Sequence, residues 1–250
     1  MPASPEPDVG RTFGRVADAY ERTRPEYAAA VIDHVARELG LSPTATVLDL
    51  AAGTGKLTRA LATRFARVIA VEPDDGMRAH IDGEALRGTA EEIPLEDDSV
   101  DAVFVADAFH WFDARRAIAE IIRVTRPGGG LAILGNDWWG GEQPAMPPEA
   151  RAMLDALFQR FHPHGAAYHQ AWIDVLEEML APVGRASFAR EEPYTGRMLA
   201  ELLLTSSSPA ALADAERDEF AAHFVPLFNG EYVLRITTEV LWTQVKPPQT

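Results

Sequence analysis

An aspartate, two glycines and a glutamate stand at spacings in this sequence that suit the binding of a cofactor. Asp49 ends a short apolar run, Gly53 and Gly55 follow it, and Glu72 stands 23 residues after Asp49. Glycines allow a ligand to approach the backbone closely, and free N–H groups at the start of a helix attract a negatively charged group. The arrangement therefore predicts a cofactor cradle between a strand and a helix.

Three kinds of cofactor compete for this cradle. A phosphate-binding loop is excluded, because Leu50 occupies its first glycine position and Leu57 its Ser/Thr position. A dinucleotide fingerprint needs a third glycine where Thr58 stands, and the Asp49 carboxylate would repel a pyrophosphate. A cofactor that carries an amino acid suits the site better, with its ammonium near Asp49 and its carboxylate near peptide N–H groups or Arg24.

Glu72 indicates that the cofactor also carries a ribose. It lies at the expected tip of the second strand, where a carboxylate can accept hydrogen bonds from both hydroxyls of a ribose. S-adenosyl-L-methionine combines an ammonium, a carboxylate and a ribose, so the residues favour this cofactor. The alternatives are a nicotinamide oxidoreductase and a regulatory or cyclase-like protein that binds S-adenosylmethionine without transferring a methyl group.

Six segments, in the same order and spacing, resemble the motifs of class I S-adenosylmethionine-dependent methyltransferases, in the type 11 branch with trans-aconitate-type and ubiquinone-type enzymes. They are residues 13–27, 49–55, 71–73, 88–94, 107–112 and 123–129. The resemblance covers residues 12 to 136 and departs from the family at Ala51, where glycine is usual. It implies methyl transfer to a small molecule, with oxygen favoured over nitrogen or carbon as the acceptor atom. The aromatic residues after the fifth strand, and a composition rich in alanine and arginine, suggest a role in natural-product tailoring.

The cradle and the resemblance together assign residues to the cofactor. The expected cofactor contacts are Phe13, Tyr20, Arg24, Asp49, Ala51, Gly53, Gly55, Glu72, Pro73, Met77, Ala90, Glu91, Asp107 and Ala108. Met77 could instead belong to the core. Ala90 and Glu91 could be plain loop residues, and Asp107 could serve only to shape a turn.

His110 is the candidate catalytic residue, because it follows the fourth strand near the expected position of the methyl group. A histidine can act as a general base near neutral pH, although His110 could also form the pocket wall or pack structurally on Trp111. The predicted substrate pocket consists of His110, Trp111, Trp138, Trp139, Tyr168 and Trp172. These rings suit a flat or hydrophobic acceptor, or else they pack an inserted segment onto the sheet.

Alternating strands and helices must bring these residues to one edge of a sheet. Strands are expected near residues 46–50, 68–71, 85–88, 100–106 and 131–134, later near 186–190 and 231–245, with a turn over 127–130. This alternation predicts an α/β fold with a doubly wound, mostly parallel, Rossmann-like sheet of seven strands. An N-terminal helical lid and a helical cap inserted after the fifth strand are expected to cover the carboxyl ends of the strands, where ligands bind in such sheets.

The chain is expected to form a single methyltransferase domain over residues 12–250, after a disordered lead-in of residues 1–11. Its expected parts are lid helices (12–43), a cofactor-binding core (44–136), a cap insert (137–184) and C-terminal helices with the last strands (185–250).

Composition argues against several kinds of partner. The 250 residues carry a formal net charge of -15, which repels the phosphates of nucleic acids. No cysteine is present, and the histidines at 162, 164 and 169 have no fixed carboxylate partner, so no metal is predicted. No apolar run reaches the roughly 18 residues of a membrane span, and no signal-peptide pattern opens the chain, so a cytoplasmic protein is expected. The oligomeric state is left open.

Overall fold

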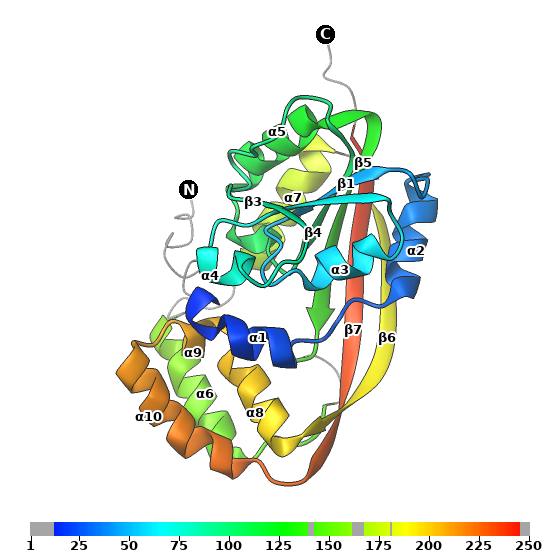
Figure 1. The fold of residues 1–250 in the computed structure, drawn as a ribbon. Coiled ribbons are helices and arrows are strands. Elements are labelled where there is room, and N and C mark those ends of the chain that lie inside the picture. The colour runs from blue at the N-terminus through cyan, green and yellow to red at the C-terminus, as the bar shows by residue number, and fades with distance from the viewer. Residues whose placement is uncertain (1–12, 140–142, 162–167, 181, 246–250) are drawn as a thin grey trace.

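The computed structural model describes residues 13–139, 143–161, 168–180 and 182–245 (Figure 1). The strands are β1 Thr46–Leu50, β2 Arg67–Val71, β3 Glu84–Leu86, β4 Val100–Ala106, β5 Thr125–Asp137, β6 Gly184–Thr195 and β7 Glu231–Gln244. The α-helices are α1 Ala17–Thr23, α2 Ala29–Glu38, α3 Lys56–Ala62, α4 Asp75–Arg78, α5 Ala114–Val124, α6 Pro148–Phe161, α7 Tyr168–Met179, α8 Gly196–Leu204, α9 Ser207–Ala210 and α10 Asp214–Phe224. Short 3₁₀ helices are η2 Phe13–Val16, η3 Phe109–Trp111 and η4 Val225–Leu227.

Seven strands form one sheet in the order β3-β2-β1-β4-β5-β7-β6. The pairs among β1 to β5 are parallel, while β7 runs antiparallel to both β5 and β6. Helices lie on both faces of the sheet (Figure 1). The predicted α/β fold, with a doubly wound and mostly parallel seven-stranded sheet, is confirmed.

Both faces of the central strands are buried under helices. Consecutive residues of a strand point to opposite faces, and Val47 and Leu48 of β1 accordingly belong to two different cores. Leu48 shares its core with Ile118 of α5, whereas Val47 shares its core with Leu61 of α3. The carboxyl edge of the sheet is therefore the place left for a ligand.

A third core joins the helices that face the lid. Leu154 of α6, Leu203 of α8 and Phe224 of α10 are buried together at the far ends of β6 and β7, beside α1 (Figure 1). Helix α7 takes another position, because Leu176 packs into the sheet core next to α5. The residues from 137 to 184, expected as one cap, thus contribute α6 to the helices facing the lid and α7 to the sheet face.

Strand β5 begins before the position expected from the sequence. Val100 of β4 pairs with Thr125, but Ala102 already pairs with Gly130, so residues 126–129 bulge out of the regular register. Gly129 allows this bulge, because a Cβ there would lie 2.5 Å from the carbonyl oxygen of Asp101. The expected turn over 127–130 is therefore a bulge within the strand.

Strands β6 and β7 form a ribbon that is longer than the rest of the sheet. β7 pairs with β6 from Glu231 to Trp242, but with β5 only from Thr237 to Gln244. The part of the ribbon beyond β5 carries the third core (Figure 1).

Candidate functional site

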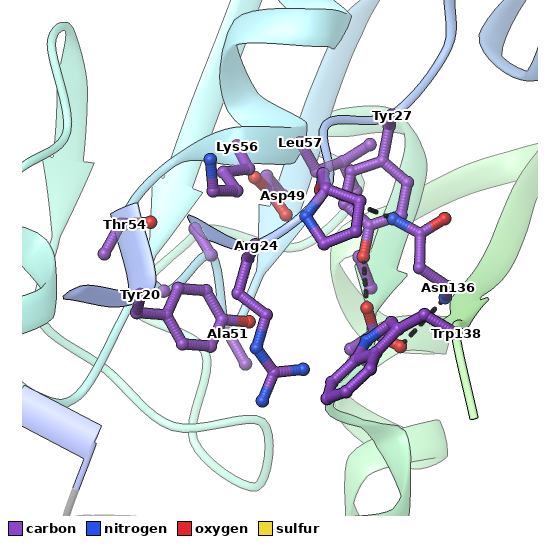
Figure 2. Close-up of a pocket in the computed structure, with 15 residues that line it drawn as sticks. Tyr20, Arg24, Tyr27, Asp49, Ala51, Thr54, Lys56, Leu57, Asn136 and Trp138 are labelled. Atoms are coloured by element: carbon purple, nitrogen blue, oxygen red, sulfur yellow. Dashed lines mark hydrogen bonds between the residues drawn. The ribbon is translucent and has the colours of Figure 1, made fainter. Parts of the chain in front are cut away.

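A cavity of about 860 Å³ lies at the carboxyl ends of the parallel strands. The lid, the turn after β1, the segments after β2, β4 and β5, and the start of α9 all contribute to its wall. The expected cofactor contacts that line it are Phe13, Tyr20, Arg24, Ala51, Gly53, Glu72, Pro73, Met77, Ala90, Glu91, Asp107 and Ala108. Asp49 lines a smaller chamber of about 30 Å³ beside it (Figure 2), and Gly55 lines neither space.

The turn after β1 is left-handed at three alternate positions. Gly53 has a φ of 58° and Gly55 a φ of 84°, a conformation that glycine adopts without strain. Ala51 has a φ of 58°, which carries a steric penalty of roughly 1–2 kcal/mol for a residue with a Cβ. The N–H of Gly55 donates to the carbonyl oxygen of Ala52 at 2.9 Å, so Gly55 shapes the turn from behind the cavity.

Asp49 holds a buried oxygen without a hydrogen-bond partner in the described structure. Its side chain is buried at the end of β1, where Oδ2 accepts a hydrogen bond from Thr58 Oγ1 at 2.6 Å and Oδ1 has no partner. Burial raises the pKa of Asp49 to about 7, although the hydrogen bond from Thr58 opposes this shift. The neighbouring chamber has room for about one water molecule. An ammonium, directly or through a water, would satisfy this oxygen.

Glu72 is fixed in place by two backbone N–H groups. Its Oε2 accepts from Gly53 and its Oε1 from Asp74, each at 2.9 Å. Burial raises the pKa of Glu72, and the two backbone hydrogen bonds partly offset that rise. Each carboxylate oxygen keeps a second lone pair, so Glu72 can also accept from the hydroxyls of a ligand.

The segment Thr23–Tyr27, here called the strap, ties the lid to the cradle. Lys56 is buried, and its Nζ lies 2.7 Å from Glu26 Oε1. Tyr194 donates to the carbonyl oxygen of Thr23 at 2.9 Å from the β6 side. The lysine after Gly55 therefore binds the lid, which agrees with the exclusion of a phosphate-binding loop.

Asp107 follows β4 and is held by groups that the sequence did not single out. Tyr27 donates its hydroxyl to Oδ2 at 2.6 Å, and the N–H of Asn136 donates to Oδ1 at 3.1 Å (Figure 2). Burial raises the pKa of Asp107, and its φ of 51° is unusual for a residue other than glycine. Asn136 lies near the end of β5, as Asp49 lies near the end of β1 and Asp107 directly after β4, and this shared position at the strand ends is the signal that could have identified Asn136.

Arg24 joins the lid to the end of α8. Its Nε donates to Thr205 Oγ1 at 2.9 Å and its Nη2 to the carbonyl oxygen of Thr205 at 2.8 Å. Its guanidinium lies over the rings of Tyr20 and Trp138, 4.8 and 5.0 Å from their centroids (Figure 2). Ser206 and Ser207, next along the chain, line the cavity. No local pattern points to these three polar residues, because only tertiary packing brings them to the site.

The predicted substrate residues divide into two groups. His110, Trp111, Trp138 and Trp139 line the cavity. Trp172 packs on Phe109 at 5.1 Å between their ring centroids, because α7 covers the sheet face, so this expected pocket residue contacts the core. The side chain of Tyr168, and residues 162 and 164, lie outside the described part of the chain.

The described residues contain no group of three or more histidines and acids that could hold a metal ion. In the same part of the chain, no helix combines the length and the apolar character that crossing a membrane requires.

The fold and the cavity define an α/β protein with a large cavity at its strand ends, and known proteins show what this chain is similar to. Residues 48–133 match the family model described as a methyltransferase domain. An uncharacterised methyltransferase of Mycobacterium tuberculosis is 51% identical over 136 residues, 52% of this chain and 54% of that protein. A malonyl-[acyl-carrier protein] O-methyltransferase of Methylococcus capsulatus is 40% identical over 139 residues, 50% of each chain.

A solved structure extends the likeness beyond these matches. The structure of a type II methyltransferase from Anaeromyxobacter dehalogenans, itself assigned by similarity, gives a TM-score of 0.56 at 25% identity and covers 90% of this chain and 99% of that one. The chain spans about half the length of the curated relatives it matches. Residues 48–133 therefore match a methyltransferase domain, and these likenesses support the class I S-adenosylmethionine-dependent methyltransferase family for this chain.

Proposed function

We propose that this protein binds S-adenosylmethionine and transfers its methyl group to a small-molecule acceptor. The observation that carries the proposal is the meeting of two buried carboxylates at the turn after β1. Asp49 offers an unpartnered oxygen beside the cavity, and Glu72 offers the free lone pairs of a fixed carboxylate within it. A cofactor with an ammonium and a ribose diol satisfies both groups at once.

The remaining wall residues suit the other parts of this cofactor. Arg24 can face its carboxylate, and Met77 and Ala90 supply an apolar wall for its adenine. The left-handed turn at Gly53 brings the backbone close to the cavity without a side chain in the way. When bound, the cofactor supplies a methyl group on a positively charged sulfur.

The residues of the chain would contribute orientation and a base. Cavity walls that hold both reactants in line can supply much of the acceleration of a bimolecular reaction. His110 lies in the wall after β4, where it would accept the proton of a hydroxyl acceptor as the oxygen attacks the methyl carbon. We propose oxygen as the first acceptor atom to test, in a natural-product tailoring reaction, and the O-methyltransferase relative supports that choice. The net charge of -15 supports a reaction without nucleic-acid partners.

Calorimetry with S-adenosylmethionine, S-adenosylhomocysteine and NAD tests the cofactor. We expect both sulfur compounds to bind and NAD to remain unbound, whereas binding of NAD alone would refute the proposal. A metabolite screen with methyl-labelled S-adenosylmethionine then tests turnover. Cofactor binding without label transfer across a broad panel would favour a protein that binds the cofactor without methylating.

A further inference from the structure

Five aromatic side chains form one side of the cavity, here called the aromatic wall: Phe13, Tyr20, Trp111, Trp138 and Trp139. We infer that the acceptor is an aromatic ring system without a positive charge and that the aromatic wall selects it. The inference rests on the proposed function, because it names the acceptor class of the same cavity.

The rings of the aromatic wall come from three separate segments and meet at the cavity. Phe13 of the lid contacts Tyr20 and Trp111 edge to face, each with 6.3 Å between ring centroids. The ring centroids of Trp138 and Trp139, which follow β5, lie 4.7 Å apart. Aromatic rings prefer such edge-to-face and offset contacts with one another, so a flat ring entering between these segments would find several partners.

Four of the five rings belong to none of the three cores, whereas Trp138 is 4% exposed and belongs to the third core. Trp139 is 44% exposed although it lines the cavity, and Phe13 and Trp111 are only half-buried. Phe109 and Trp172, by contrast, stack within the sheet core and line no part of this cavity. A large exposed aromatic surface that faces a cavity marks a place where a ligand contacts the protein.

Arg24 decides the charge of the acceptor. Its guanidinium already lies over Tyr20 and Trp138, the ring faces that would otherwise attract a cation. A positively charged acceptor could use these two ring faces only by displacing the guanidinium, which is held in place because Thr205 accepts two of its N–H groups.

The volume of the cavity allows two ligands side by side. At about 860 Å³ it lies near the upper end of the roughly 300–1,000 Å³ that small-molecule sites occupy. The carboxylates lie at the cradle, and the aromatic wall extends from the lid to the segment after β5. The cofactor and a fused-ring acceptor can therefore share the space.

Calorimetry on the full chain, saturated with S-adenosylhomocysteine, tests the inference with probes of matched shape. The aromatic probes are phenol, 2-naphthol and 9-phenanthrol; decahydro-2-naphthol removes the aromaticity of 2-naphthol, and 2-naphthylmethylamine adds a positive charge. We expect at least one aromatic alcohol to bind, and 2-naphthol to bind at least about tenfold more tightly than its saturated or cationic counterpart.

Two variants test whether the aromatic wall provides the affinity for 2-naphthol. Trp139→Leu should weaken 2-naphthol binding about three- to tenfold, the loss of one aromatic contact. Phe158→Leu is the matched control, because Phe158 is a 40% exposed aromatic residue on α6 outside the cavity lining. Affinity for S-adenosylhomocysteine should stay unchanged in both variants.

The outcomes separate the inference from the proposed function. If the loaded protein binds no aromatic alcohol, or binds the saturated or cationic probe as well as 2-naphthol, the acceptor class is refuted while the cofactor proposal stands. An equal loss in both variants would also refute it. Failure to bind S-adenosylhomocysteine would instead refute the proposed function. The same probes would then be titrated into the ligand-free protein, and a preference for 2-naphthol there would support the aromatic wall independently of the cofactor.

Discussion

The substitution Asp49→Asn should remove a pH dependence from cofactor binding. Asp49 is 1% exposed, and burial raises its pKa to about 7 in the ligand-free protein. An ammonium beside its unpartnered oxygen favours the charged carboxylate, so binding releases a proton wherever the free carboxyl group is protonated. Affinity for S-adenosylhomocysteine should therefore rise with pH until Asp49 is ionised.

The size of the effect follows from the pKa of Asp49. For a group that titrates at about 7 and is ionised in the complex, apparent affinity is about twofold lower at pH 7 and about tenfold lower at pH 6 than at pH 8. Tenfold corresponds to about 1.4 kcal/mol of binding free energy. Asparagine keeps the shape but cannot ionise, so the variant should bind more weakly at pH 8 and show no such slope.

Calorimetry at pH 6, 7 and 8, in buffers of different ionisation enthalpy, measures both affinity and released protons. About half a proton should leave at pH 7 in the wild type and none in Asp49→Asn. Glu96→Gln, at an exposed acid, is the control and should behave as wild type. A flat wild-type profile between pH 6 and 8, or the same slope in the Asp49 variant, would show that ionisation of Asp49 does not govern cofactor binding.

The stability of the ligand-free protein should change with pH in the direction opposite to that of ligand affinity. Asp49 has a higher pKa folded than unfolded, so the folded state binds more protons, and ionisation destabilises it as pH rises from about 4 to 7. The shift from 3.8 to about 7 sets an upper limit of about 4 kcal/mol on this loss. Urea unfolding at pH 4 and 8 should show the gain of Asp49→Asn over wild type only at the higher pH.

Three more substitutions test the cradle and the strap. Ala51→Gly should raise the free energy of unfolding by up to about 1 kcal/mol, because glycine adopts a φ of 58° without strain. Urea unfolding measures this, and a lower free energy of unfolding in the variant would show that Ala51 is not strained. Glu72→Gln should weaken S-adenosylhomocysteine binding at least about tenfold in calorimetry. Glutamine has one accepting oxygen and an amide nitrogen that cannot accept, so it cannot accept from both Gly53 and Asp74 as Glu72 does. Unchanged affinity would show that Glu72 does not contact the ligand. Lys56→Met should speed S-adenosylhomocysteine release in stopped-flow experiments, because it removes the shorter of the two ion pairs of Glu26 in the strap and leaves only Arg59, at 3.3 Å. An unchanged rate would show that the Lys56–Glu26 ion pair does not retain the ligand.

Much of the fold could be predicted because its signals are local. Strand β4 is apolar apart from Asp101 near its start, and Asp113 begins α5 by accepting from the N–H of Arg116. The position of α7 could not be predicted in this way. Its apolar face had to be buried, but the sequence does not state whether Leu176 packs on the sheet or on the helices beside the lid.

The site residues likewise divide into those with local signals in the sequence and those that only tertiary packing brings together. Asp49 and Glu72 were predictable because a strand and its own turn position them. Tyr27 reaches Asp107 across 80 residues of chain, and Thr205 reaches Arg24 across 181, so only the folded structure brings them together. Trp172 shows the converse limit, since an aromatic residue on an amphipathic helix can face a cavity or a core with the same sequence pattern.

The position of β7 imposes an order on folding during synthesis. This strand lies between β5 and β6, yet it is the last of the three to leave the ribosome. Until it arrives, the edge of β5 is open and β6 has no partner, so the newly made chain exposes two unpaired strand edges of the kind that aggregate. Once β7 inserts, it joins the first half of the chain to the second in one step. A nascent chain stalled before Glu231 should therefore depend on chaperones, whereas the completed chain should not.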